Sequence, residues 1–395
     1  MKIAILSTDN SKIIKYGGKH VHQNLLERGL VKLGYNLKTF YPPIPNSTPK
    51  MHRIFKRIFL KPKTIFSYYE RYKEVIEQYF AFFSSLKLDC FNLSHFHDAI
   101  ALYSVNHPVS IITLHGYLAK ETVNYMPDNY FAKMDKHKIF NFCMEVERKA
   151  LEKARYIITV DTRIKKYVMQ EFGFPEDRIT VMYNAIDTDL FSPITEEEKN
   201  LLRDKLKLPK KSLIVLVPRR YVKKNGVDYA AMAFSKIKSK DYFFVFIGDG
   251  NLKLKIKEIL KDNDNALILN ALPNSEIHEY YKAADVVLIP SVNSDDVEEA
   301  TSLSMLEGMA CGKVTICTNV GGMKEIVKHM ENGLLIEQKK PEAIIEILQY
   351  VKNNYEGLYE LRQKARKYVT KNHSYIEHTK KTVEIYKKVL ADNRR

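Results

Sequence analysis

The chain has 395 residues, of which 45% are hydrophobic and 28% are charged, and prolines and glycines are few. This is the composition of a globular protein, and the length is too great for one ordinary core, so we expect two domains. No apolar run approaches the length of a membrane span. The N-terminal apolar run Ile3–Leu6 is too short for a signal peptide, and the chain enters a strand at once.

Cysteine usage and charge indicate a compartment and a class of partner. The four cysteines are scattered and form no CxxC pair. That pattern argues against a disulfide framework or a zinc site and fits a reducing cytoplasm. The formal net charge is +16, from 63 basic and 47 acidic residues. We therefore expect attraction to something anionic, which could be nucleic acid, anionic lipid or a phosphorylated substrate.

The basic charge is concentrated in an acid-free stretch between Arg28 and Tyr69. Within it, MHRIFKRIFLK places apolar residues on one helical face and Arg53, Lys56 and Arg57 on the other. This pattern predicts either a helix on an anionic membrane surface or a core helix with a solvated basic face. Residues 50–73 are thus the candidate docking surface of a protein peripheral to the inner face of the cell membrane.

The first half alternates strands and helices. A strand at Lys2–Ser7 leads to a loop ending in Gly17-Gly18, and a helix at about Lys19–Leu33 follows. The glycine pair lets backbone approach a phosphate, or forms a plain tight turn. Later elements are strands at Leu37–Phe40, Ser110–Leu114, Tyr156–Val160 and Ile179–Met182, and helices at about His137–Lys153 and Arg163–Phe172.

The second half repeats this alternation, which predicts α/β domains with parallel sheets and helices on both faces. Its apolar runs are Leu213–Val217, Tyr242–Ile247, Ala266–Leu269, Val286–Ile289, Val314–Cys317 and Gly333–Ile336. A last helix is expected at about Tyr375–Leu390. We expect a first domain of residues 1–190, joined by 376–395, and a second domain of residues 191–375.

Three histidines invite a metal interpretation, which we reject. His95 and His97 form an H-x-H pair without a nearby set of carboxylates and cysteines, and single histidines are common at strand ends as hydrogen-bonding groups. His115 lies just beyond the strand Ser110–Leu114. The carboxyl ends of strands are where open α/β sheets bind ligands, so His115 is a candidate site residue.

The second half carries its polar groups beyond strand ends as well. Arg219 and Lys224 follow Val217, and Glu299 and Glu307 stand eight residues apart around a predicted helix start at Thr301–Leu303. Eight helical residues rise about 12 Å, a span that suits one carboxylate at a sugar and one at a ribose. The alternative is an ordinary surface helix with two glutamates.

Together these groups predict how a sugar–phosphate bond could be broken. Arg219 and Lys224 offer positive charge to a diphosphate, and a helix N-terminus offers free N–H groups to the same anion. A leaving diphosphate gains charge as the bond breaks, and preorganised cations stabilise it without a metal.

Motifs over nearly the whole chain then carry a family resemblance. They are GGKHVHQ, TLHG at Thr113–Gly116, RITVMYNAIDTDLFSP, PRRYVKKNGVD, FIGDG, YYKAADVVLIPS, the E-x7-E of Glu299 and Glu307, MACG and Gly321-Gly322. The chain resembles the family-four retaining glycosyltransferases, whose GT-B fold has two Rossmann-like domains facing a cleft. The resemblance implies transfer of a sugar from a nucleotide-sugar, UDP- or GDP-linked, to a glycan or lipid-linked acceptor in polysaccharide or glycoconjugate synthesis.

The resemblance also implies roles for individual residues. Arg219 and Lys224 would bind the donor diphosphate, Glu299 the donor sugar and Glu307 the ribose hydroxyls. The remaining donor-binding positions would be Gly17, Gly18, Ala271, Leu272, Thr301, Ser302 and Leu303. His115 would lie by the sugar at the reacting centre. No metal or other cofactor is expected, because a donor phosphate oxygen takes the acceptor proton.

Two departures from the family pattern bear on the donor. Ala300-Thr301-Ser302 replaces the usual Gly-Phe-Gly after the first glutamate, and Pro218 replaces the usual glycine before the arginine. Neither removes a charge, but the first changes the sugar pocket.

Three alternatives remain for comparison. A sugar-nucleotide 2-epimerase of the same fold would act on the donor without an acceptor. A nucleic-acid-binding protein would explain the charge, but the paired glutamates would be misplaced at a phosphate-binding surface, so no nucleic-acid partner is expected. An NAD-dependent oxidoreductase is disfavoured, since no G-x-G-x-x-G follows the first strand.

Overall fold

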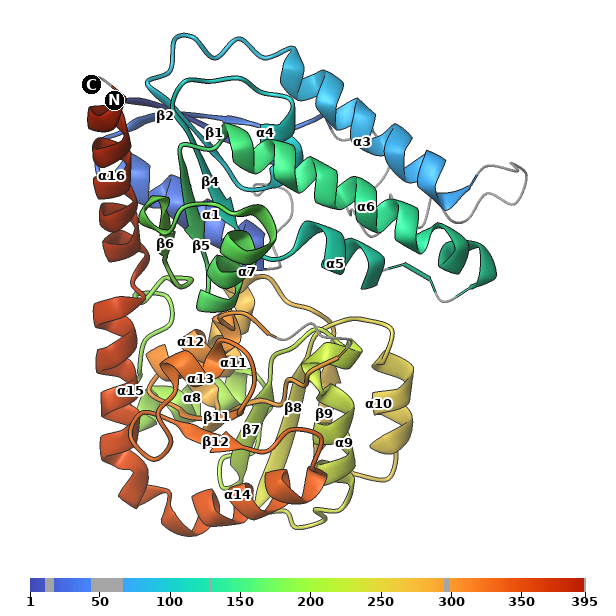
Figure 1. Cartoon of the computed structure of the whole chain (residues 1–395). Helices are drawn as coiled ribbons and strands as arrows, with labels where there is room; N and C mark the ends of the chain where they lie inside the picture. The colour runs from blue at the N-terminus through green and yellow to red at the C-terminus, as the bar shows by residue number, and fades with distance from the viewer. Residues whose placement is uncertain (11–17, 44–66, 125, 128, 295–298, 394–395) are drawn as a thin grey trace. The chain divides into compact units, whose positions relative to one another are not determined.

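The computed structural model describes residues 1–10, 18–43, 67–124, 126–127, 129–294 and 299–393. They form two compact units (Figure 1). Unit 1 contains Met1–Tyr183 and His378–Arg395, and unit 2 contains Asn184–Glu377. From the sequence we expected these divisions after residues 190 and 375. Gly17 and the basic stretch from Lys50 to Lys63 lie outside the described residues.

Unit 1 is built on a parallel sheet whose described strands run in the order β2-β1-β3-β4-β5-β6. The strands are β1 (Lys2–Leu6), β2 (Asn36–Phe40), β3 (Leu93–Phe96), β4 (Ser110–Leu114), β5 (Tyr156–Thr159) and β6 (Ile179–Val181). The helices between them are α1 (Gly18–Lys32), α3 (Tyr68–Ser84), α4 (Ala99–Tyr103), α5 (Leu118–Asn124), α6 (Tyr130–Lys153) and α7 (Thr162–Phe172), with a 3₁₀ turn η1 (Glu176–Arg178).

The last helix, α16 (Tyr375–Asp392), completes the core of unit 1. Val383, Tyr386 and Val389 are buried with residues of β1, β3 and β4. The Tyr386 hydroxyl lies 2.6 Å from Nδ1 of His95 on β3. Figure 1 shows α16 in red, with the N-terminus of the chain beside one end of it. The sequence predicted that residues 376–395 return to the first domain, and the helix packs there.

Unit 2 repeats the parallel architecture, with described strands in the order β12-β11-β10-β7-β8-β9. The strands are β7 (Leu213–Val217), β8 (Tyr242–Ile247), β9 (Ala266–Leu269), β10 (Val286–Ile289), β11 (Val314–Thr318) and β12 (Leu334–Ile336). The helices and 3₁₀ turns are α8 (Glu196–Lys205), η2 (Lys223–Asn225), α9 (Val227–Ser235), α10 (Lys253–Ile259), α11 (Asn274–Ala283), α12 (Leu303–Ala310), α13 (Met323–Ile326), α14 (Pro341–Asn354), η3 (Glu356–Leu358) and α15 (Tyr359–Asn372).

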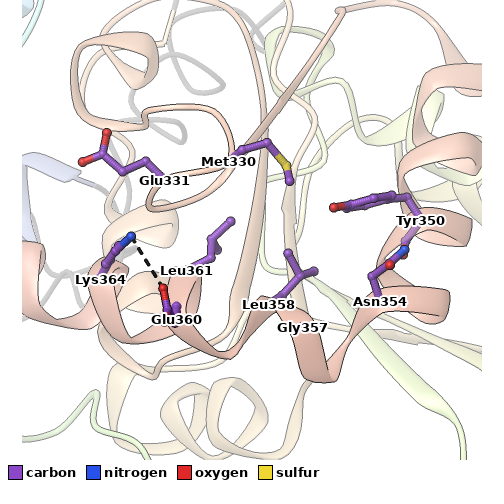
Figure 2. Close-up of a pocket in the computed structure, with 9 residues that line it drawn as sticks. All are labelled: Met330, Glu331, Tyr350, Asn354, Gly357, Leu358, Glu360, Leu361 and Lys364. Atoms are coloured by element: carbon purple, nitrogen blue, oxygen red, sulfur yellow. Dashed lines mark hydrogen bonds and ion pairs between the residues drawn. The ribbon is translucent and has the colours of Figure 1, made fainter.

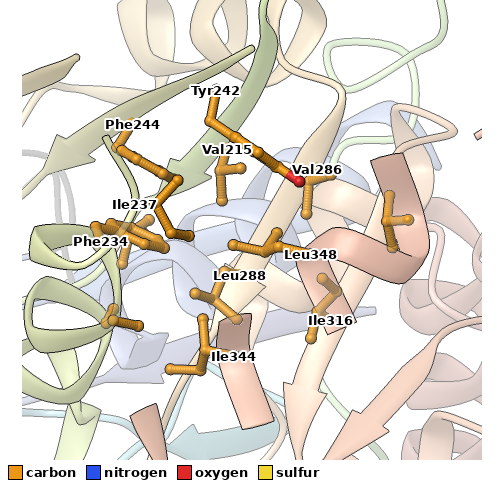
Figure 3. Packing of buried hydrophobic residues seen from close by; sticks show 14 of the residues in the cluster. Val215, Phe234, Ile237, Tyr242, Phe244, Val286, Leu288, Ile316, Ile344 and Leu348 are labelled. Atoms are coloured by element: carbon orange, nitrogen blue, oxygen red, sulfur yellow. The ribbon is translucent and has the colours of Figure 1, made fainter. Parts of the chain in front are cut away.

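The core of unit 2 forms where α9 and α14 cover one face of this sheet. Phe234 of α9 stacks on Phe244 of β8 with ring centroids 3.9 Å apart. Leu348 of α14 is fully buried above Leu288 and Ile316 of the strands (Figure 3). Because both faces of a parallel sheet are covered, its strands read as unbroken apolar runs, which is why the sequence predicted them closely.

One helix start was predicted wrongly. The helix expected from His137 begins at Tyr130, because the Asn129 side chain caps it by accepting from the N–H of Ala132 at 2.9 Å. The start of α12 was predicted correctly, because this helix begins at Leu303 with Ser302 as its N-cap, within the predicted Thr301–Leu303, and Glu299 precedes it. The rise of an eight-residue helix therefore does not set the separation of Glu299 and Glu307.

None of the helices among the described residues is long and apolar enough to cross a membrane.

Candidate functional site

The candidate site of unit 2 lies at the carboxyl edge of its sheet, where the loops after β7 and β10 approach α12. Parallel strands all end at the same edge, so these loops gather there. The amide of Val292, beyond β10, donates to the carbonyl of Lys224 at 2.9 Å, joining the two loops. The sequence placed Arg219, Lys224 and Glu299 in these loops, and the structure brings the three together.

Arg219 is the hub of the site. Its side chain is buried and donates to Glu299 Oε2 at 2.7 Å and to Ser302 Oγ at 3.0 Å. It also donates to Asn225 Oδ1 at 2.8 Å and to Ser291 Oγ at 3.0 Å. These bonds fix the guanidinium plane, so the positive charge is preorganised rather than mobile.

Glu299 is held as a carboxylate by its cationic neighbours. Burial by itself would raise its pKa, but Arg219 and then Lys224 oppose burial and lower the pKa to about 2. The group is therefore ionised at any physiological pH. A buried carboxylate beside a fixed guanidinium can accept hydrogen bonds from neutral hydroxyls without competing for protons.

The start of α12 brings backbone N–H groups to the same place. Ser302 is the N-cap, and its Oγ accepts from the N–H of Met305 at 3.4 Å as well as from Arg219. The first turn of a helix leaves N–H groups without intrahelical acceptors and carries partial positive charge. Ser302 thus joins the guanidinium to the positive end of a helix.

Thr301 and Gly321 fix the backbone between Glu299 and the helix. The side chain of Asn184 donates to the carbonyl of Thr301 at 3.1 Å. The N–H of Gly322 donates to the carbonyl of Glu299 at 3.0 Å. A Cβ on Gly321 would lie 1.9 Å from that carbonyl oxygen, and Gly321 has φ +58. Glycine is therefore required where this loop crosses Gly321.

Substituting Gly321 by alanine is expected to disturb the site as well as the fold. The left-handed backbone and the clash with Glu299 should together cost about 1–3 kcal/mol of unfolding free energy or more. Thermal unfolding and nucleotide binding would measure the two effects. Gly357→Ala is the matched control, since no heavy atom lies within 4 Å of the place that a Cβ would take there. Equal stability of the two variants would contradict the assigned constraint.

Glu307 lies on the buried face of α12 and accepts a hydrogen bond from a tyrosine side chain. Tyr281, on α11, donates to Glu307 Oε2 at 2.6 Å, and both residues are buried. Burial raises the pKa of Glu307 to about 7, although the bond from Tyr281 acts in the opposite direction. Glu307 is therefore the one of the two glutamates that changes charge near neutral pH.

Replacing Glu307 by glutamine is expected to stabilise the protein at pH 8 but not at pH 4.5. A raised folded-state pKa means that the folded state holds its proton longer, so the native protein loses stability between pH 4.5 and about 7. Glutamine has no such loss, and the variant should gain up to roughly 3 kcal/mol at pH 8. Chemical denaturation of both proteins at the two pH values would measure it. A pH-independent difference would contradict the assigned pKa.

The other residues that were predicted to bind the nucleotide-sugar donor are farther from Arg219 along the chain. Ala271 and Leu272 lie in the loop between β9 and α11, exposed and half-buried respectively. Gly18 is the first residue of α1 in unit 1, and no heavy atom lies within 4 Å of its Cβ position. Close approach of other described chain segments therefore does not explain a glycine at position 18.

His115 lies in unit 1, directly after β4, as the sequence predicted. Its Nε2 is 3.2 Å from Nδ1 of His97, which directly follows β3. Burial, followed by the neighbouring His22 and Lys19, lowers the pKa of His115 well below its ordinary value. The imidazole is therefore neutral at physiological pH.

Several residues that shape the site were missed from the sequence. Ser291 and Asn225 hold the guanidinium of Arg219, and Tyr281 holds Glu307. The position of Ser291 just beyond β10 is the kind of pattern that would have found it. Tyr281 follows another tyrosine on one helix, and the sequence does not distinguish the one that faces inward.

A surface cavity of about 280 Å³ also occurs in unit 2, but it shares no residue with the site. Figure 2 shows its lining, which comes from the segment around Met330 and from α14, η3 and α15. Its polar groups include Asn354 and the ion pair of Glu360 and Lys364. The lining of this cavity contains neither a buried cationic side chain held in place nor the N-terminus of a helix that could bind an anion, so the cavity is not the candidate site.

Comparison with known proteins matches both halves of the chain. Residues 198–372 match the family model of glycosyl transferases group 1, and residues 16–190 match that of glycosyltransferase family 4. An uncharacterized glycosyltransferase of Methanocaldococcus jannaschii is 29% identical over 236 residues, which are 58% of this chain and 59% of that protein. For three of the curated relatives the matched part spans 43 to 59% of their length.

Solved structures share the fold over the whole chain. Sucrose-phosphate synthase from Thermosynechococcus elongatus superposes with a TM-score of 0.75 at 18% identity, covering 99% of each chain. Anabaena HepE in complex with UDP-glucose has a TM-score of 0.68 at 15% identity, covering 98% of this chain and 100% of that one. The two six-stranded parallel sheets of the described residues are those of the GT-B fold. Together the two family models cover most of the chain, which therefore belongs to the GT-B, family-4-like glycosyltransferase superfamily.

Proposed function

We propose that the protein is a retaining, metal-independent glycosyltransferase that moves a sugar from a nucleotide-sugar donor to a glycan or lipid-linked acceptor. One observation carries the proposal. Arg219 donates both to Glu299 and to Ser302, the N-cap of α12, so a cation, an anion acceptor for hydroxyls and a helix start occupy one place. A sugar diphosphate presents the complementary groups.

The diphosphate would be bound by positive charge that is already in position. Arg219 and Lys224 lie close enough to Glu299 to lower its pKa, and the N–H groups of Leu303 and Ser304 open α12 beside Ser302. As the sugar–phosphate bond breaks, negative charge grows on the departing diphosphate. Groups that need no rearrangement stabilise that charge most in the transition state, which accelerates the reaction.

The two glutamates have different tasks in this proposal. Glu299, ionised and fixed by Arg219, accepts from the hydroxyls of the donor sugar. Glu307 accepts from the ribose hydroxyls while Tyr281 occupies its Oε2. Ala271 and Leu272 would contact the base.

The transfer step requires no protein nucleophile. The bond from the sugar's anomeric carbon to the phosphate oxygen breaks, and a bond to the acceptor oxygen forms on the same face. The acceptor proton passes to the departing phosphate oxygen. His115 is neutral, so its ring can donate or accept a hydrogen bond but does not supply a positive charge.

A thermal-shift panel of UDP, GDP, ADP and their sugars tests the proposal. A ligand that binds the folded protein raises its unfolding temperature, and a concentration of 100 times Kd stabilises it by about 2.7 kcal/mol. Because HepE has been solved with UDP-glucose, UDP compounds are the first choice. We expect one nucleotide class to shift the transition and to support transfer. No shift with any nucleoside diphosphate would contradict the proposal.

The acceptor is proposed to lie at an anionic membrane, to which the sequence of residues 50–73 would dock. Substituting Arg53, Lys56 and Arg57 by glutamate should abolish co-sedimentation with anionic vesicles, since each basic residue contributes about 1 kcal/mol of attraction. A control with the same change of charge replaces the exposed residues Lys207, Lys211 and Lys240 by glutamate. Equal binding of the two variants would argue against docking through this segment.

A further inference from the structure

Unit 1 contains a cluster of three histidines that none of the preceding assignments uses as a group. We propose that His22, His97 and His115 form a site for a transition-metal cation of the Zn²⁺ type, whose occupation inhibits the enzyme by engaging His115. The binding stands on the geometry of unit 1. The inhibition rests on the function proposed above.

The three imidazoles converge from separate elements at one edge of the sheet. His97 and His115 directly follow the neighbouring strands β3 and β4, and His22 lies on the buried face of α1. One ligand nitrogen from each ring lies within 4.8 Å of the others. Elements whose positions are fixed by the core therefore bring three imidazole rings together.

Two of the nitrogens are already at ligand spacing. Nδ1 of His97 and Nε2 of His115 are 3.2 Å apart. Nitrogens at about 2.0–2.1 Å from a tetrahedral zinc ion lie about 3.3 Å from each other. The ring of His22 is 4.8 Å from that of His115 and 5.8 Å from that of His97, centroid to centroid. The ligand nitrogens all lie within 4.8 Å of one another. Rotation of the His22 side chain would therefore have to bring its nitrogen closer to the other two by at most about 1.5 Å.

The imidazoles of His97 and His115 are in the protonation state that binds metal. Burial is the largest cause that lowers the pKa of His97 and of His115 well below the ordinary value. Neutral imidazole is the ligand form, so no imidazolium proton has to be displaced at neutral pH. The hydrogen that Nδ1 of His97 and Nε2 of His115 share has to move to the other nitrogen of its ring before both can bind the metal. Nε2 of His97 is buried and has no hydrogen-bond partner among the described residues. The ring thus retains bonding capacity that packing has not used.

A fourth histidine, His95, shows the contrast. It stacks on His97 with ring centroids 4.6 Å apart, and burial lowers its pKa to about 3. Its nitrogens lie 2.6 Å from the Tyr386 hydroxyl and 2.8 Å from the Thr113 hydroxyl. Both are committed to hydrogen bonds within the core. The H-x-H pair considered in the sequence is therefore not the metal pair, and His22 takes the place of His95.

The local charge can accommodate a cation. Nζ of Lys19 lies 3.0 Å from Asp9 and 2.8 Å from Asp98. The positive charge of Lys19 also helps to lower the pKa of His97 and of His115. Two carboxylates against one ammonium leave a formal charge of −1 in this trio. That charge offsets part of the cost of placing a dication beside a lysine.

Metal titration of the full-length protein tests the site. After dialysis against a chelator, wild type is expected to bind one Zn²⁺ per chain, and Co²⁺ should give the visible absorption of a tetrahedral nitrogen-ligated ion. His22→Gln and His97→Gln should each weaken Zn²⁺ binding by about 100-fold or more. His137→Gln, which alters an exposed histidine on α6, is the matched control and should bind as wild type does. Thermal unfolding of the metal-free variants checks that they are folded.

Two outcomes overturn the site. One is the absence of stoichiometric binding by wild type, and the other is unchanged affinity in the folded His22→Gln and His97→Gln variants. In transfer assays, Zn²⁺ should inhibit wild type, and His22→Gln should lose that sensitivity. Zinc bound at this site without inhibition overturns the regulatory half. A protein without any transfer activity would instead contradict the proposed function, and the titration would still decide the metal site.

Discussion

Replacing Arg219 by alanine is expected to lower kcat/KM for transfer by about 10²–10³-fold or more, the cost of removing a preorganised group from developing charge. Arg219 donates to Glu299 Oε2 at 2.7 Å and to Ser302 Oγ at 3.0 Å. Alanine removes the positive charge that is proposed to bind the diphosphate. It also removes the hydrogen bonds that position Glu299 and Ser302. Steady-state kinetics with the donor that the thermal-shift panel identifies would measure the loss.

The same variant should also be less stable, which separates it from a purely local change. Glu299 would lose the partner that keeps it ionised, and a buried carboxylate without its partner costs about 3–5 kcal/mol. Arg220→Ala is the matched control, because Arg220 is the exposed neighbour on the same loop. Wild-type transfer by Arg219→Ala, or an equal loss in Arg220→Ala, would contradict the role of Arg219.

Replacing Lys224 by alanine is the second large effect and should leave the fold intact. Lys224 is half-buried at η2, and its positive charge contributes to the low pKa of Glu299. We expect a loss of about 10²-fold in kcat/KM, because one cation at the departing diphosphate is gone. Kinetics and thermal unfolding, measured together, would show lost activity at nearly unchanged stability.

The adjacent Lys223 provides the comparison for Lys224. Lys223→Ala removes the same charge from an exposed position one residue away. If net positive charge near the site were sufficient, the two variants would lose activity equally. The proposed contact with the diphosphate predicts that Lys223→Ala retains most of the activity. Full activity of Lys224→Ala would contradict the proposed role of Lys224 at the diphosphate.

The sequence predicted the strands of unit 2 more closely than the start of helix α6 in unit 1. Val286–Ile289 is an unbroken apolar run because β10 is covered on both faces, and its bounds were predicted as the structure has them. The start of α6 was placed seven residues late, because Asn129 precedes mixed aromatic and charged residues with no clear apolar stripe. Capping by one side chain decided that boundary.

The sequence predicted which residues belong to the site, but it did not predict which of their side chains contact one another. Arg219 and Glu299 stand 80 positions apart, and the ion pair between them depends on loops that follow different strands. Ser302 was expected to offer its backbone, whereas its hydroxyl also joins Arg219 to the helix start. Tyr281 and His22 lie on the buried faces of their helices. Tertiary packing decides which face of a helix is buried, so the sequence did not single out these two residues.

The most direct test of the account is a crystal structure of the protein with the nucleoside diphosphate that it binds most tightly. The account predicts that the distal phosphate lies within hydrogen-bond distance of Arg219, of Lys224 and of the first N–H groups of α12. A phosphate bound elsewhere, with no contact to Arg219 and with Lys224 turned to solvent, would contradict it.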